Sequence, residues 1–186
     1  MNAAFQAQFS IDDLIHLFDK LFKDTENTVL VKGEDEPLYL PKSASSPHHQ
    51  IIFAHGFFAS ALHELAHWCI AGIERRQKID YGYWYEPDGR TLKQQESFAA
   101  VEARPQALEW VFNKACGRRF HISLDNLDGL PGDDLPFKKA VLAQIAHLQQ
   151  GGLPPRAEKL QRRLAHFYGQ SDDWLDYRFC LSELSA

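Results

Sequence analysis

Residues 51–72 read IIFAHGFFASALHELAHWCIAG, and this stretch decides the fold of the chain. It is the most apolar segment of the sequence, and Glu64 is the only Asp, Glu, Lys or Arg within it. Its length approaches that of a membrane span, but Glu64 and three histidines, His55, His63 and His67, interrupt it. We therefore interpret the segment as buried core, with a strand at residues 50–54 followed by a helix at residues 58–76.

The pattern HELAH at residues 63–67 places two imidazoles four residues apart, on one face of the expected helix. Two such nitrogens can bind one metal ion, and a divalent cation offsets the cost of burying Glu64 with the histidines. The pattern predicts a metal-binding HExxH helix with a zincin-like local arrangement. The alternative is that His63 and His67 are hydrogen-bonded core residues and that the pattern arose by chance.

A third protein ligand is expected on another element, because two histidines leave the coordination shell open. We favour Glu102, because Pro105 removes the helical partner of the Val101 carbonyl and should bend the chain beside Glu102. The alternative is that Glu102 is a solvated helix residue, like Glu96 or Glu109. The acidic candidates are Glu86, Asp88, Glu96, Glu102 and Glu109.

Two further residues of the segment have open roles. Glu64 is predicted to be catalytic, either as a general base beside metal-bound water or as a group that orients a histidine. His55 either contacts a ligand in the same pocket or is a hydrogen-bonded histidine of the core, and we favour the core interpretation.

Outward from this segment, periodicity predicts one α+β domain over residues 1–186, mostly helical with a small sheet. Ser10 followed by Asp13 is typical of a capped helix start. Helices are expected at residues 11–22, 58–76, 91–116 (interrupted at Pro105), 135–149 and 156–168, and strands at 28–31, 38–40, 50–54, 81–85 and 120–124.

Composition excludes several classes of protein. A chain of 186 residues that is 45% hydrophobic and 24% charged is neither disordered nor collagen-like. Its net charge of −5 argues against direct nucleic-acid binding through overall charge. Three widely spaced cysteines without a C-x-x-C pattern fit a reducing compartment, and no secretory signal is recognised, so a cytoplasmic protein is expected.

Basic residues gather in three clusters of this acidic chain, and each is either a solvated face or part of a docking surface for an acidic macromolecule. The clusters are Arg75, Arg76 and Lys78; Lys114, Arg118 and Arg119; and Arg156, Lys159, Arg162 and Arg163.

Seven stretches, between about residue 29 and residue 129, carry a resemblance to a known family. They are EPLYLP (36–41), FAHGF (53–57), ALHELAHWCIA (61–71), GYWY (82–85), PDGR (87–90), VEARPQA (101–107) and LDNL (124–127). Together they resemble bacterial elongation factor P hydroxylase.

The resemblance implies an oxygen-dependent monooxygenase that hydroxylates the β-lysylated lysine of translation elongation factor P. It assigns the metal ligands to His63, His67 and Glu102, and implies Fe(II) with dioxygen as co-substrate. No His-x-Asp or His-x-Glu occurs in the chain, so a 2-oxoglutarate requirement is not expected. The family's substrate is acidic, which gives the basic clusters a docking role, and no membrane partner is expected.

Two other classes of function remain open from the residues themselves. A zinc metallopeptidase would use Glu64 as its base and would not consume oxygen. A non-catalytic module would use the metal only to stabilise the fold, through a fully coordinated site.

Overall fold

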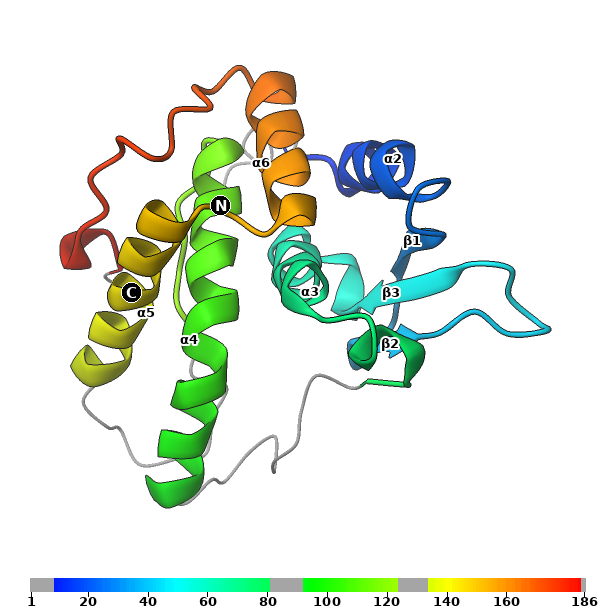
Figure 1. Ribbon diagram of the computed structural model, residues 1–186, viewed down its shortest axis with the longest axis horizontal. Coiled ribbons are helices and arrows are strands. Elements are labelled where there is room, and N and C mark those ends of the chain that lie inside the picture. The colour runs from blue at the N-terminus through cyan, green and yellow to red at the C-terminus, as the bar shows by residue number, and fades with distance from the viewer. Residues whose placement is uncertain (1–8, 81–91, 124–133, 185–186) are drawn as a thin grey trace. The chain divides into compact units, whose positions relative to one another are not determined.

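The computed structural model describes residues 9–80, 92–123 and 134–184. These ranges contain five α-helices and a three-stranded sheet, which confirms the predicted α+β class with a helical majority (Figure 1). The chain divides into two compact units, residues 1–82 and residues 83–186. One domain over residues 1–186 stays a prediction. None of the helices in the described ranges combines the length and the apolar character needed to cross a bilayer.

The first unit is built on a sheet of three short strands, close to their predicted positions. These are β1 (Thr28–Lys32), β2 (Leu38–Leu40) and β3 (His49–Phe53). The central strand is β3, which pairs in parallel with β1 and antiparallel with β2. Alternate residues of β3 are buried, as expected for a strand with one face on the core.

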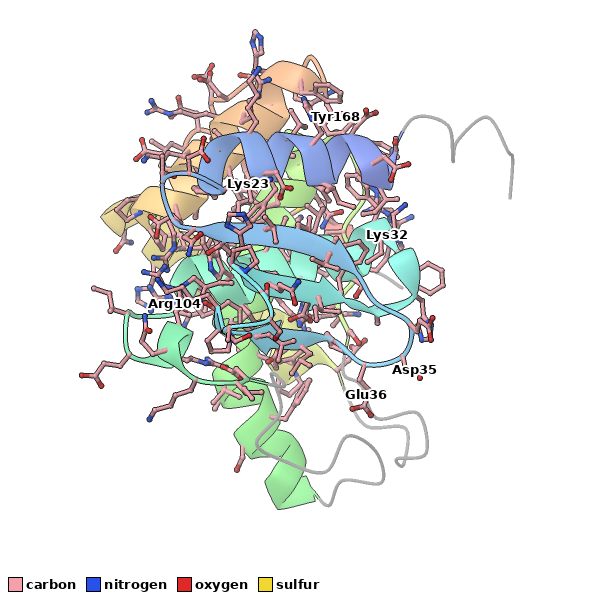
Figure 2. The ribbon with its side chains drawn as sticks, turned by 90° about the vertical axis from the view of Figure 1, so that its right-hand side faces the viewer. Lys23, Lys32, Asp35, Glu36, Arg104 and Tyr168 are labelled. Atoms are coloured by element: carbon pink, nitrogen blue, oxygen red, sulfur yellow. The ribbon has the colours of Figure 1, made fainter. Side chains whose placement is uncertain are left out.

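Helix α2 (Ile11–Phe22) begins as predicted, because the Ser10 hydroxyl accepts a hydrogen bond from the Asp13 N–H at 3.3 Å. It runs antiparallel beside β1, so Asp12 near its start lies 2.7 Å from Lys32 at the end of the strand (Figure 2). The buried face of α2 consists of Leu14, Leu17, Phe18 and Phe22.

Helix α3 (Phe58–Ile70) is six residues shorter than the predicted helix 58–76. Ala71 has φ −59° and ψ 128°, which leaves the helical region of the backbone. Beyond it, Arg75–Gln77 form a separate 3-10 turn, and Arg75 pairs with Asp80 and Arg76 with Glu26. Periodicity alone did not reveal these partners.

The second unit consists of α4 (Leu92–Ala115), α5 (Leu135–Gly151) and α6 (Pro155–Phe167). Helix α4 packs against both of the others, and it lies beside α5 in Figure 1. The predicted interruption at Pro105 is wrong, since α4 continues through this residue. A proline inside a helix costs about 3 kcal/mol, and the burial of a long run that includes Leu108, Trp110 and Val111 offsets that cost.

The predicted strand 120–124 is also wrong for residues 120–123, which adopt no regular secondary structure. Phe120 is buried and stacks on Trp110 with ring centroids 5.8 Å apart. The backbone of Ser123 pairs with a side chain, because its N–H donates to Gln106 Oε1 at 3.1 Å and its carbonyl accepts from Gln106 Nε2 at 2.7 Å. The predicted strand 81–85 lies outside the described residues.

The free energy of unfolding should depend on pH through the protonation of His49. Its Nδ1 accepts a hydrogen bond from the Lys42 N–H, and burial, followed by the charges of Lys42 and Arg76, lowers its pKa below 6.5. As pH falls below 6.5, the unfolded chain binds a proton at this residue before the folded chain does. We therefore expect His49 to contribute to the free energy of unfolding above pH 6.5. Below pH 6.5 this contribution should be lost, by at most about 1.4 kcal/mol per pH unit.

The measurement is urea unfolding at pH 7.5 and at pH 5.5 for the wild type and for His49→Gln. The wild type should lose more stability than the variant between these pH values. Equal losses in the two proteins would show that His49 titrates alike in the folded and unfolded chains.

Candidate functional site

The first unit brings His63 and His67 together on α3. Their Nε2 atoms are 3.0 Å apart, and their rings are inclined at 70° with centroids 4.7 Å apart. Residues four apart lie one turn apart on a helix, so this proximity follows directly from the HELAH spacing. Both residues are half-buried, so neither belongs to the fully buried core.

The buried face of α3 fixes the direction of the two imidazoles. Ala61, Leu62, Leu65 and Ala66 are completely buried. Trp68 packs on α2, with its ring centroid 5.2 Å from that of Phe18 and 4.9 Å from that of Phe22. This packing prevents α3 from rotating about its axis, so the histidines keep one orientation relative to the sheet.

The pair of nitrogens fits a shared cation. Two imidazole nitrogens 3.0 Å apart can both lie at the usual distance of about 2.0–2.1 Å from one divalent metal ion. The same separation also suits a hydrogen bond between one protonated and one unprotonated nitrogen. Both interpretations made from the sequence are therefore compatible with this geometry, and metal analysis distinguishes them.

Glu64 and His67 line a small cavity of the first unit, with a volume of about 30 Å³. A cavity of this size holds about one water molecule. Two walls are fixed by polar contacts: the Tyr39 hydroxyl donates to the Arg76 carbonyl at 2.9 Å, and Arg75 pairs with Asp80. Glu64 therefore lines a cavity that can hold about one water molecule, and His67, one of the paired histidines, lines the same cavity.

Sequence reasoning missed two further residues that line this cavity, Tyr39 and Asp80. Tyr39 comes from β2, and its backbone pairs with that of Asp80, with N–H···O distances of 2.7 and 3.1 Å. This bridge joins segments about forty residues apart in the chain. The EPLYLP stretch contains Tyr39, but nothing in its local pattern indicates which residue it meets.

His55 does not have the core role favoured from the sequence. Its side chain is exposed, and it occupies the turn between β3 and α3 with φ +52°. This left-handed conformation is uncommon for a residue other than glycine. The apolar surroundings in the sequence suggested burial, but the turn directs His55 outward.

Glu102 lies on α4, in the second unit, and only 2% of it is exposed. The alternative of a solvated helix residue is therefore wrong for Glu102, and also for Glu109, which is 7% exposed. A buried carboxylate requires hydrogen bonds or a cation to offset its desolvation. Because Glu102 and the histidines belong to different units, its metal ligation stays a prediction.

The other acidic candidates carry less information. Glu86 and Asp88 lie outside the described residues, as do the GYWY and PDGR stretches.

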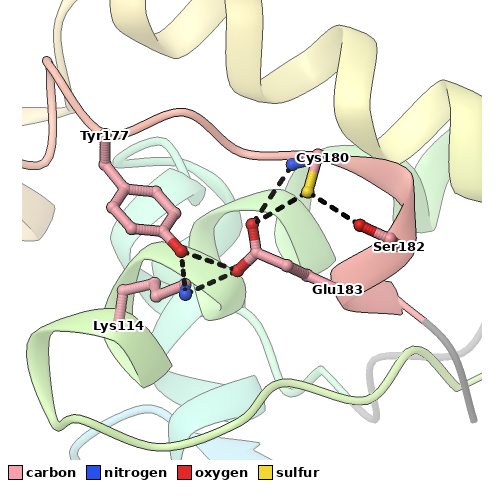
Figure 3. Close-up of polar contacts among 5 residues, drawn as sticks. All are labelled: Lys114, Tyr177, Cys180, Ser182 and Glu183. Atoms are coloured by element: carbon pink, nitrogen blue, oxygen red, sulfur yellow. Dashed lines mark hydrogen bonds and ion pairs between the residues drawn. The ribbon is translucent and has the colours of Figure 1, made fainter.

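Among the basic clusters, Lys114 pairs with Glu183 (Figure 3), and Arg162 pairs with Glu158. Several basic residues therefore have an acidic partner within their own unit.

Comparison with known proteins now identifies the relatives of this chain. The family model described as elongation factor P hydroxylase matches residues 17–177. A Haemophilus influenzae protein named elongation factor P lysine hydroxylase is 51% identical over 166 residues, which cover 89% of this chain and 93% of that protein. Both findings confirm the resemblance seen in the sequence, and with it the prediction of an enzyme. The chain belongs to the elongation factor P hydroxylase family.

Proposed function

We propose that this chain hydroxylates a lysine of elongation factor P, and that the β-lysylated form of that lysine is the substrate. The observation that carries the proposal is the 51% identity to a protein named for this activity, along 93% of its length. The paired imidazoles on α3 can bind a metal ion, and such a reaction needs one.

The metal ligands in this proposal are His63, His67 and Glu102. Two imidazoles and one carboxylate are the donor set of non-haem iron oxygenases that keep open coordination positions. Burial of the Glu102 carboxylate supports a cationic partner. Bound Fe(II) would supply the activation of dioxygen, which no amino-acid side chain provides; Zn²⁺ is the alternative metal.

The chain itself would position and shield the reacting groups. The buried face of α3 holds His63 and His67 in one orientation. Glu64 is half-buried beside the small cavity and is proposed to hold a proton there or to orient His67. The site is proposed to work without 2-oxoglutarate, in the cytoplasm.

The proposed ligand set requires both compact units, because α3 belongs to one and α4 to the other. We therefore propose that residues 1–186 act as a single catalytic domain. The second unit would contribute Glu102 and the first unit the two histidines.

The proposed function is tested by incubating purified protein with β-lysylated elongation factor P, in air and under anaerobic conditions. We expect the substrate to gain the mass of one oxygen atom only in air, and the purified protein to contain iron. An unchanged substrate mass in air would contradict the function. Turnover that continues without oxygen, or peptide cleavage by a zinc-loaded protein, would favour a hydrolase instead.

Docking of the acidic substrate is proposed to involve the basic cluster on α6. Arg162 is 65% exposed at its side chain and pairs with Glu158 at 2.7 Å on the same helix. Reversing the charge of Arg162 and Arg163 together should raise the KM for elongation factor P by about five- to tenfold and weaken the salt dependence of KM. The kcat should change little.

The matched control reverses two exposed charges outside the clusters, Lys139→Glu with Arg178→Glu. Its KM should stay near that of the wild type. If the two double variants behave alike, the effect comes from net charge and the docking role of α6 is wrong.

A further inference from the structure

Residues 71–80 follow α3 and end beside β2 (Figure 1). This segment presents two large apolar side chains to solvent, since Ile73 is 73% exposed and Ile79 is 59% exposed. Single apolar side chains are common on protein surfaces, so exposure alone indicates no function. A functional role has to follow from where the segment lies and from how it is held.

The segment adjoins the cavity that His67 lines. Arg75 and Asp80 belong to the segment and line the same cavity. Ile79 directly precedes Asp80, and Ile73 lies two residues before Arg75. Their Cα atoms are therefore within about 3.8 Å and about 7.2 Å, respectively, of the Cα atoms of residues in the cavity wall. Both exposed isoleucines lie next to a cavity at one of the proposed metal ligands.

Polar contacts hold the segment in one conformation. Arg76 Nη1 lies 2.9 Å from Glu26 Oε2, and Arg76 Cζ lies 5.9 Å from the centroid of the Trp68 ring on α3. The Arg76 carbonyl accepts a hydrogen bond from the Tyr39 hydroxyl. Between the two isoleucines, Arg75–Gln77 form the 3-10 turn. Because the backbone is already fixed, little ordering is needed when a partner covers this surface, which favours binding.

The segment contributes little net charge to the surface. Each of its two arginines pairs with a carboxylate of the same unit. Exposed Lys78 is balanced in formal charge by exposed Glu74. A partner on this surface would therefore be held by apolar contact, and its affinity would respond little to salt.

We propose that Ile73 and Ile79 contact the protein substrate next to its modified lysine. The inference rests on the proposed function, in which that lysine reaches a metal ion held by His63 and His67. Because the segment forms part of the wall beside His67, substrate residues that flank the lysine approach it when the lysine enters. Apolar side chains of the substrate cover both isoleucines, and the burial of apolar area stabilises the complex.

The test measures binding of β-lysylated elongation factor P to the full-length protein by calorimetry under anaerobic conditions, which separates binding from turnover. The double variant Ile73→Ser with Ile79→Ser should raise the Kd by about tenfold, because both apolar contacts are lost. The increase should be the same at low and at high salt. In air, the KM should rise by a similar factor, and kcat should stay within about twofold of the wild type.

Two matched variants control for the change of side chain. Ile73→Val with Ile79→Val keeps branched apolar side chains and should leave the Kd within about twofold of the wild type. Leu175→Ser changes a side chain that is 53% exposed in the second unit and does not line the cavity at His67, and it should leave the Kd unchanged. Thermal unfolding should differ little among these proteins, because the altered residues are exposed.

Three results would overturn the proposal. The first is an equal Kd for the wild type and the serine double variant. If the wild type hydroxylates its substrate at the same time, the docking surface is wrong and the proposed function stands. The second is a clear loss of stability in the serine double variant, which would show that the isoleucines are covered within the protein. The third is a wild-type dimer that the same variant converts to a monomer in sedimentation, which would assign the surface to a second copy of the chain.

The opposite combination separates the two proposals in the other direction. A wild type that binds the substrate but never hydroxylates it, together with weaker binding by the serine double variant, would contradict the proposed function and support the docking surface. A wild type that neither binds nor hydroxylates the substrate would contradict both.

Discussion

His63→Ala is expected to lower the rate of elongation factor P hydroxylation by at least about 100-fold, more than is typical for residues that only support a metal ligand. The variant removes one of two imidazole nitrogens that lie 3.0 Å apart. The remaining His67 cannot hold a metal ion with the same affinity. Metal content after purification should fall in parallel, and mass spectrometry of the substrate measures the rate.

The control for His63→Ala is His16→Ala, which removes an exposed histidine of α2. This variant should keep both its metal and its activity. Because His63 is only half-buried, we expect the free energy of unfolding of His63→Ala to change by no more than about 1 kcal/mol. A His63→Ala protein that keeps its metal and its activity would remove the histidine pair from the mechanism.

Glu102→Gln is expected to cause a loss of activity of the same order, at least about 100-fold. Glutamine keeps the shape of the buried side chain, but its neutral amide oxygen is a weaker ligand than a carboxylate. The loss should therefore appear in metal affinity as well as in turnover. Titration of the metal-free protein with Fe(II) under anaerobic conditions measures that affinity directly.

Glu109→Gln provides a matched comparison, because Glu109 is also a buried glutamate of α4. It is seven residues from Glu102, so both lie on the same side of the helix. Full metal affinity in Glu109→Gln with reduced affinity in Glu102→Gln would assign the ligand to Glu102. Equal affinity in the wild type and Glu102→Gln would contradict the proposed ligand set.

Local features could be predicted from the sequence where a single local pattern determined them. The cap at Ser10 and the apolar positions of residues 11–22 predicted α2, because an amphipathic helix on a sheet needs only its own pattern. The HELAH spacing likewise predicted a paired imidazole arrangement. Both features depend on residues within one or two turns of each other.

The errors in the prediction arose where tertiary contacts outweighed local signals. Pro105 predicted an interruption, but the burial of its helix maintained the regular backbone. A strand was predicted at residues 120–124, but residues 120–123 form none, and Gln106 satisfies the backbone of Ser123. Helix α3 ends at Ile70, where Ala71 leaves the helical region, and the arginines that follow pair with Glu26 and Asp80.

By itself, the sequence determined the class of the fold, the family of the chain and the spacing that pairs His63 with His67. Only the tertiary structure decided that Glu102 is buried, that His55 is exposed and that Asp80 lines a cavity with His67. The physical reason is that helical spacing fixes neighbours within a turn or two. Burial depends instead on segments distant in the chain, whose contacts leave no periodic signal in the sequence.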